Sequence, residues 1–241
     1  MCAEAWAPSV AGMDRLAPPF AAFAALLLLP ACAASAETVE LPYADDFSEP
    51  CAWDGNEEFS ADCDDDALVV ELGAGAGVHS AMKTFEPATE ALTLEAAPGF
   101  AAEVRTQDDL SLGLGCWTSR EGGGYVFLVS PAGRVAILAE EAGTGQLRPL
   151  VMRGTPMPGF RLHGALRVDC VGGPHETTLA LSLDGAQVEV AKVERADERF
   201  SILGFVTAND GAESAFRFDD ASARELTRTE ADQLRARAAS G

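Results

Sequence analysis

Trp117 is the residue of this 241-residue chain best placed to hold a ligand by stacking, because it follows Cys116 at the end of a short apolar strand pattern. Sugar rings have apolar C–H faces that pack on exposed aromatic side chains, while Asp, Asn, Arg or Glu bind the hydroxyls. If Cys116 points inward, alternation along a strand turns Trp117 outward. The same alternation turns three charged residues outward: Arg105, Arg167 and Asp169. If their strands lie in one sheet, the sequence predicts a polar face with one stacking platform.

Two plainer interpretations compete with this binding face. Trp117 can cover a sheet edge, with the charged side chains around it simply solvated. Trp53 lies between Cys51 and Cys63 and is a second candidate platform. A small local core around Trp53 is the alternative.

Four aspartates near the ends of the strand-rich region suggest a cation site. Two stand near the first expected strand and two near the last: Asp45, Asp46, Asp219 and Asp220. Terminal strands of a sandwich often pair, which would gather four carboxylates, and a cation such as calcium would neutralise them. Four solvated acids are the alternative.

The cysteines are expected to form disulfides. Export leaves four of them, an even number, and four cysteines allow three pairings. We favour Cys51–Cys63, which closes an acidic loop, and Cys116–Cys170, which joins two strand patterns in which both cysteines fall on the apolar phase. Zinc binding is the alternative, but no C-x-x-C pair is present and the three histidines are scattered.

Short strand patterns with tight turns position these residues. Apolar residues alternate through 110–138, which predicts an antiparallel meander, and Asp184-Gly185 predicts a hairpin turn. Similar patterns recur through residues 37–227, which we expect to form one all-β domain, a two-sheet antiparallel jelly-roll sandwich. A helical period appears only at 225–239, so residues 228–241 are expected to be a short helical or disordered tail.

The N-terminus predicts export. Residues 1–36 have the layout of a secretory signal peptide, with translation starting at Met13, an apolar run at 20–29 and a cleavage site before Glu37. That run is too short to span a bilayer. Residues 29–32, LPAC, are similar to a bacterial lipobox, so a lipid anchor on Cys32 is the alternative to free secretion, and a buried N-terminal helix is the third.

The charge of the chain argues against two classes of partner. Its formal net charge is −21, with 38 acidic against 17 basic residues. Such a surface repels phosphate backbones and anionic headgroups, so we expect neither nucleic-acid nor membrane-surface binding. Solubility is the simplest reason for the acidic composition.

Several short motifs together resemble concanavalin A-like, laminin-G-like sandwich domains of exported bacterial proteins, a group that includes domains related to keto-disaccharide hydrolases. They run in this order over residues 41–226: DDFS at 45–48, GLGC at 113–116, GYVF at 124–127, LRVDC at 166–170, LSLDG at 181–185 and FRFDD at 216–220. The resemblance implies the sandwich fold, and the group contains both binders and enzymes.

No catalytic motif is recognisable. Glucanases of this fold carry E-x-D-x-x-E on one strand, but the only E-x-D here is Glu230-Ala231-Asp232, followed by Arg235 where the last glutamate should be. We therefore expect no catalytic residue and no cofactor beyond structural calcium. The sequence favours an exported, non-catalytic module that binds carbohydrate or another cell-surface ligand. A keto-disaccharide glycoside hydrolase and a structural envelope protein without a small ligand are the alternatives.

Overall fold

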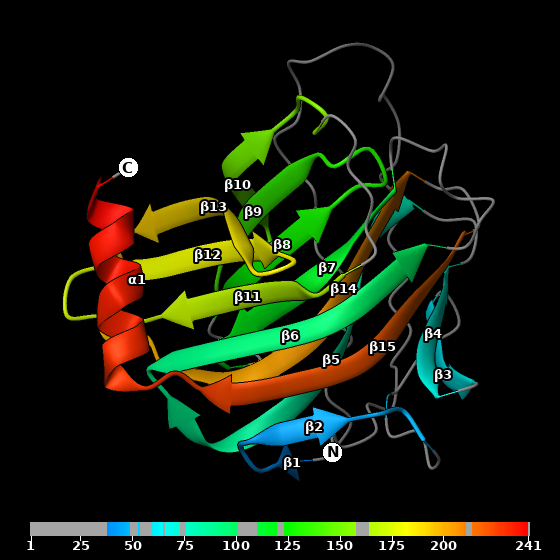
Figure 1. Cartoon of the computed structure of the whole chain (residues 1–241), viewed down its shortest axis with the longest axis horizontal. Coiled ribbons are helices and arrows are strands. Elements are labelled where there is room, and N and C mark those ends of the chain that lie inside the picture. The colour runs from blue at the N-terminus through cyan, green and yellow to red at the C-terminus, as the bar shows by residue number, and fades with distance from the viewer. Residues whose placement is uncertain are drawn as a thin grey trace.

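The strand patterns pair into two sheets that pack face to face (Figure 1). The computed structural model describes residues 38–48, 53, 59–64, 66–72, 76–100, 110–119, 123–157, 164–210 and 214–240. In spatial order, sheet A contains β1 (Thr38–Val39), β5 (Ala76–Thr89), β14 (Phe200–Asp210), β7 (Ser111–Trp117), β8 (Gly124–Val129), β9 (Val135–Glu140) and β10 (Leu147–Arg153). Sheet B contains β13 (Ala186–Val193), β12 (Thr177–Leu183), β11 (Leu166–Val171), β6 (Ala91–Phe100), β15 (Ser214–Glu225), β4 (Ala67–Leu72) and β3 (Phe59–Asp64), with β2 (Tyr43–Asp45) paired to β15.

The strands pair in the way that the turn residues predict. β7 to β10 form the expected antiparallel meander. β12 and β13 form the expected hairpin, in which Asp184 and Gly185 both have positive φ, 50° and 76°. Among the described strands, only β1 pairs in parallel, along β5. The all-β jelly-roll sandwich predicted from the sequence is confirmed.

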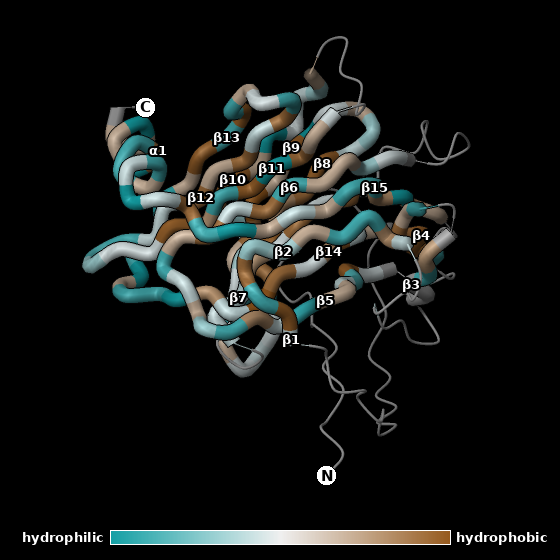
Figure 2. The backbone as a smooth tube through the Cα atoms, turned by 60° about the horizontal axis from the view of Figure 1, so that its bottom comes forward, coloured by the Kyte–Doolittle hydropathy of each residue, from teal (hydrophilic) through white to brown (hydrophobic). Residues whose placement is uncertain are grey.

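One hydrophobic core fills the space between the sheets. Alternate residues of β7, β8, β6 and β11 point into it and are almost fully buried, and Figure 2 shows hydrophobic stretches interspersed with hydrophilic ones along the strands. The buried Cys116–Cys170 disulfide crosses this core and links sheet A to sheet B, as expected. Cys63 is also disulfide-bonded, while its expected partner Cys51 lies outside the described residues. Cys32 and the expected signal peptide lie outside them too.

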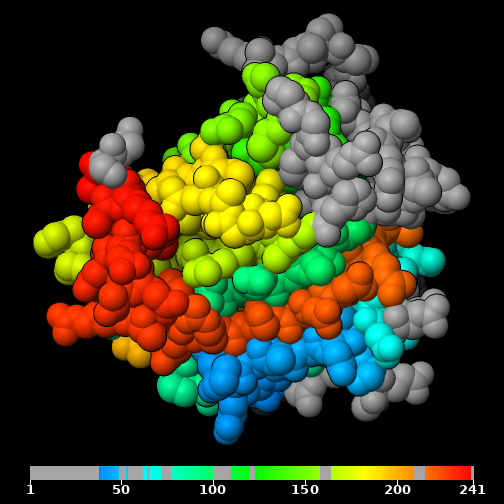
Figure 3. Space-filling model, viewed as in Figure 1, coloured from blue at the N-terminus to red at the C-terminus, as the bar shows by residue number. Residues whose placement is uncertain are grey.

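The C-terminal tail is an ordered helix, α1 (Arg228–Ser240), which packs across one end of the outer face of sheet B (Figures 1 and 3). Leu226, Ala231 and Leu234 form an apolar cluster with Val171 and Ala180 of the sheet. A guanidinium nitrogen of the helix, Nη2 of Arg235, donates to the backbone oxygen of Gly172 at 2.5 Å. In the described part of the chain, no helix has the length and apolar character needed to span a membrane.

Candidate functional site

The structure separates Trp117 from the charged residues that were expected to share its face. Trp117 ends β7 in sheet A, whereas Arg167 and Asp169 belong to β11 in sheet B. The Cys116–Cys170 disulfide joins the inner faces of these two strands, so the side chains next to the cysteines point away from each other, onto opposite outer faces. The expectation of one shared face is therefore wrong. Arg105 lies outside the described residues.

Trp117 is buried rather than exposed, which corrects the expectation of a stacking platform. Its side chain lies flat over neighbouring strands and is 3% exposed. A Cβ atom added to Gly115 would stand 2.2 Å from indole Cη2, and one added to Gly124 would stand 2.2 Å from Cδ1. These two glycines therefore leave the room that the ring occupies. Indole Nε1 donates to Oε2 of Glu140 at 2.7 Å and fixes the ring in its plane.

Glu140 is a buried acid on the outer face of sheet A. Desolvation raises the pKa of its carboxyl group, and the hydrogen bond from Trp117 offsets only part of that effect. A carboxyl group of raised pKa is suited to act as a general acid, but glycoside hydrolysis needs a second carboxyl group roughly 5–10 Å away. Among the described residues, the hydrogen-bond partner of the Glu140 carboxyl is this indole and not another acid.

Trp53 belongs to a small local core, the second of its two interpretations. Its side chain is 4% exposed, and its ring centroid lies 4.8 Å from that of Phe205 in an edge-on arrangement. Indole Nε1 donates to Oδ2 of Asp45 at 3.0 Å. The buried ammonium of Lys83 lies 5.0 Å from the Trp53 ring, a cation–π contact. These contacts give Trp53 a structural role and leave little of the ring for a ligand.

The four aspartates expected to share a cation do not gather, although β2 does pair with β15. Their carboxylates are held by local donors instead: Asp45 accepts from Tyr43, Trp53 and the Phe47 nitrogen, Asp46 from Ser48, and Asp219 from Arg217. Asp220 takes a left-handed conformation, φ 46°, where the pairing of β15 with β6 shifts. Within the described ranges, no group of three or more His, Cys, Asp or Glu side chains could hold a metal ion. The expected calcium site is therefore not formed by these residues.

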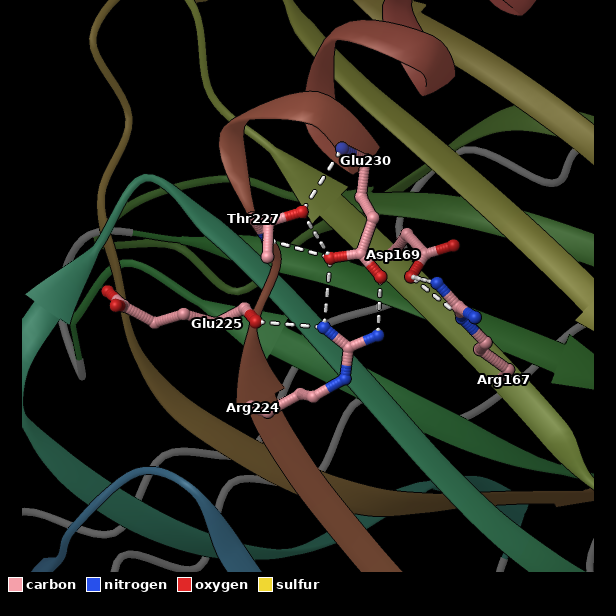
Figure 4. Close-up of polar contacts among 6 residues, drawn as sticks. All are labelled: Arg167, Asp169, Arg224, Glu225, Thr227 and Glu230. Atoms are coloured by element: carbon pink, nitrogen blue, oxygen red, sulfur yellow. Dashed lines mark hydrogen bonds and ion pairs between the residues drawn. The ribbon is translucent and has the colours of Figure 1, made fainter.

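A polar cluster does form on the outer face of sheet B, across β15, β6 and β11 (Figure 4). In one row Thr93 stands between Arg224 and Asp169, its register partners on the two neighbouring strands. In the next row Glu95 stands between Ser222 and Arg167. Cross-strand partners lie within reach of each other's side chains. We call the following six residues, which include one from α1, the sheet B polar cluster: Thr93, Glu95, Arg167, Asp169, Arg224 and Glu230.

Arg167 and Asp169 form an ion pair in which one carboxylate oxygen remains available. The guanidinium donates from Nε at 3.0 Å and approaches through Nη2 at 2.9 Å, in both cases to Oδ1. Asp169 is 5% exposed, so a buried charge is compensated by its neighbour. Among the described residues, no donor reaches its other oxygen, Oδ2.

Arg224 and Glu230 form a second, bidentate pair that ties β15 to α1. Arg224 donates from Nη2 to Oε1 at 2.7 Å and from Nη1 to Oε2 at 3.1 Å. Thr227, the residue before the helix, donates to the same carboxylate from its backbone nitrogen at 2.8 Å, and Glu230 N donates back to its hydroxyl at 3.3 Å. This is a capping box. The hydrogen bond from Arg224, followed by those from Thr227, lowers the pKa of Glu230 to about 2.

Thr93 contributes a hydroxyl group at the centre of the first row. The residue is 5% exposed, and its Oγ1 has no hydrogen-bond partner among the described residues. Buried polar atoms are almost always paired. Between Arg224 and Asp169, this hydroxyl is an unpaired donor and acceptor that is enclosed by its neighbours, so it lies beneath the face and not on it.

Sequence reasoning found two members of this cluster and missed the rest. Leu92 and Leu94 alternate with Thr93 and Glu95, so the strand period alone could have placed the latter two on an outer face. Thr227 and Glu230 match the T-x-x-E spacing of a capping box, a signal that predicts the helix start. No local signal shows that Arg224 meets Glu230.

The outer face of sheet B beside the cluster, between α1 and β15, is not covered by the helix (Figure 3). A small recess lies beneath the bulge of β15, between the sheets, and is lined mainly by apolar core residues such as Leu94, Leu114 and Phe205, so it is not part of this outer surface. The arrangement is a shallow polar surface, which can bind hydroxyl-rich groups through hydrogen bonds.

Comparison with solved structures identifies the fold. A lichenase, a prokaryotic β-1,3-1,4-glucanase from a mouse hindgut metagenome, is similar over 76% of this chain and 99% of its own, with 9% identity and a TM-score of 0.51. The chain has a concanavalin A-like β-sandwich fold. No protein-family model and no curated protein matches its sequence.

Two further structures share this concanavalin A-like fold. The GH43B protein of a Bacteroides ovatus xyloglucan PUL is similar over 83% of this chain, with 13% identity and a TM-score of 0.52, and this chain covers 42% of it. A GlcNAcα1-4Gal-releasing endo-β-galactosidase from Clostridium perfringens is similar over 76% of this chain and 62% of its own, with 10% identity and a TM-score of 0.51. At these identities the likeness establishes the fold.

Proposed function

We propose that this protein is a non-catalytic carbohydrate-binding module and that the sheet B polar cluster is its binding site. The observation that carries the proposal is the ion pair of Arg167 and Asp169, in which Oδ2 of Asp169 meets no donor among the described residues and the guanidinium beside it is partly exposed. A sugar hydroxyl both donates and accepts a hydrogen bond, so it complements a carboxylate oxygen beside a guanidinium group. The similar structures named above are carbohydrate-acting proteins by their names, which supports the same class of ligand.

The shape of the site supports binding without a deep pocket. The side chains of Arg167 and Arg224 are 32% and 43% exposed, so their edges are accessible at the surface while the paired carboxylates fix their planes. Rigid, paired side chains lose little freedom when a ligand arrives. Shallow contact of this kind suits a sugar chain lying across the strands.

A keto-disaccharide glycoside hydrolase is the alternative function, and the distribution of acids favours the binding role. Hydrolysis needs a protonated acid and an ionised carboxylate facing the same bond. In the cluster, the pKa of Glu230 is held at about 2, so this acid is ionised at neutral pH. Glu140, whose pKa is raised by burial, lies on the outer face of the other sheet, hydrogen-bonded to Trp117.

We propose that the module acts outside the cytoplasm, freely secreted or periplasmic, with a lipid anchor on Cys32 as the alternative. This rests on the signal-like residues 1–36 and on the disulfide Cys116–Cys170, since disulfides persist in oxidising compartments. Its partner would be a glycan or another component of the cell envelope.

A glycan-binding measurement on the protein from Glu37 onward tests the proposal. Asp169→Asn is compared with Asp219→Asn, because each aspartate accepts from an arginine two residues earlier on a strand of sheet B. We expect Asp169→Asn to weaken binding of any glycan recognised on an array about tenfold, since a hydrogen bond to a charged group contributes about 1.5–3 kcal/mol. Asp219→Asn should leave that binding unchanged.

Any of three results would contradict the proposal. Glycan binding that survives Asp169→Asn would place the site elsewhere. Failure of the wild type to bind any glycan on the array would favour a structural envelope protein. Release of reducing sugar from any bound glycan would favour the hydrolase.

A further inference from the structure

Resting on the proposed function, we infer that the sheet B polar cluster selects neutral sugars over uronic acids, and that Glu230 of α1 sets this preference by occupying the guanidinium of Arg224. A uronic acid differs from the matching neutral hexose by a carboxylate at C6. The inference therefore concerns which groups on this face could accept a carboxylate.

Arg224 has the geometry of a carboxylate receptor, and that receptor is filled from within the chain. Its Nη2 and Nη1 atoms contact the two oxygens of Glu230 at 2.7 and 3.1 Å, the parallel arrangement that guanidinium groups use to bind carboxylates. A sugar carboxylate at this position would have to displace Glu230. Its hydroxyls would not, because they can donate to the unused oxygen of Asp169.

Glu230 is held in place by the helix as well as by the arginine. Its Oε2 atom accepts from the backbone nitrogen and from the hydroxyl of Thr227, at 2.8 and 2.7 Å. The helix is in turn anchored to sheet B by Leu226, Ala231 and Leu234. Moving the carboxylate aside would break the helix cap, so Glu230 is a fixed part of the face.

The rest of the cluster offers no substitute for Arg224. The other guanidinium, that of Arg167, is paired with Asp169, and Glu95 stands opposite Arg167 on the next strand. The cluster thus holds three carboxylates and two guanidiniums, each guanidinium paired, in a chain of net charge −21. An added carboxylate would meet repulsion without an unpaired guanidinium charge to compensate it.

Matched oligosaccharides that differ only at C6 test this inference. Binding of β-1,4-mannohexaose and its mannuronate counterpart, cellohexaose and its glucuronate counterpart, and α-1,4-galactohexaose and oligogalacturonate is measured by calorimetry at low salt. The variants are Glu230→Gln, Asp232→Asn and the double variant Arg224→Gln/Glu230→Gln. Gln can keep the capping box, and Asp232→Asn makes the same change of charge on the same helix, where Asp232 pairs with Arg235.

We expect the wild type to bind at least one neutral oligosaccharide and to bind its uronate at least tenfold more weakly. Glu230→Gln should strengthen binding of that uronate about tenfold, since it frees a bidentate donor. Asp232→Asn and the double variant should show no such gain. Helix content by circular dichroism must match the wild type in every variant, so that the change reports on the face and not on the loss of α1.

Three outcomes separate this inference from the function on which it rests. A wild type that binds uronates as well as neutral sugars would overturn the inference and leave the carbohydrate-binding role standing. A preference for neutral sugars that Glu230→Gln does not relax would overturn the role of Glu230. Failure of every oligosaccharide, neutral and acidic, to bind the wild type, together with silence on the glycan array, would overturn the proposed function itself.

Discussion

At the scale of single residues, the packing of Trp117 requires glycine at positions 115 and 124, where a Cβ atom would collide with the indole. We expect Gly115→Ala to destabilise the protein by about 1–3 kcal/mol, because the new Cβ would stand 2.2 Å from the indole and displace the ring from its packed position. Urea denaturation measures the change. Gly154→Ala is the control, since nothing lies within 4 Å of a Cβ at that exposed position. Equal stability of the two variants would show that the indole is free to move.

Glu140 should make stability depend on pH in the direction opposite to most carboxylates. Burial raises its pKa, so the folded state favours the protonated form, and the contribution of Glu140 is fully present below its ordinary pKa of 4.5 and lost as pH rises through the raised value. Glu140→Gln keeps an acceptor for Trp117 and removes the titration. We expect the unfolding free energy of this variant, relative to that of the wild type, to increase as the pH rises from 4.5 to 8. A difference that stays constant across this range would contradict the account.

The direction of a side chain could be read from the sequence, whereas its burial could not. Strand alternation places Trp117 opposite in direction to Cys116, and the same rule applies to Arg167 beside Val168. Whether an outward side chain is exposed depends on residues far along the chain. Trp117, for example, is hydrogen-bonded to Glu140, 23 residues later. That contact requires the meander to have folded.

At the scale of elements, α1 is joined to the sandwich by an ion pair whose pH dependence can be measured. Its hydrogen bonds lower the pKa of Glu230 from 4.5 to about 2, so the stabilisation is present above pH 4.5 and lost as pH falls toward 2. We expect the protection of α1 amides against hydrogen exchange, taken relative to the intrinsic exchange rate at each pH, to fall over that range in the wild type. In Glu230→Gln this protection should already be low at pH 5, while Asp232→Asn should follow the wild type. Identical profiles for all three would refute this role of the Arg224–Glu230 pair.

The sheet to which each strand belongs is the main feature that the sequence leaves open. A period of two identifies β7 and β11 as half-buried strands, and it is the same for both sheets. The expected disulfide between them does not decide whether the two strands lie in the same sheet or in facing sheets. The observed topology puts them in different sheets, and this separates Trp117 from Asp169.

At the scale of the whole molecule, contacts across the core hold the two faces in a fixed relation. The Cys116–Cys170 disulfide is one of them. Another is Glu198, whose Oε2 accepts from Tyr125 of sheet A at 2.5 Å and from Thr177 of sheet B at 2.7 Å. The overall sandwich could be predicted from alternation, turns and cysteine phase. The binding face could not, because it is assembled from three strands and a helix that only the complete fold brings together.

The most direct test of the account is to map the glycan-binding surface by backbone and indole NMR shifts, titrating the protein with a glycan that the array identifies. We predict that the largest shifts appear at Thr93, Asp169 and Arg224, and that the indole Nε1–H signal of Trp117 stays in place. The opposite pattern, with the Trp117 signal shifting and those of β6, β11 and β15 unchanged, would contradict the assignment of the site to sheet B.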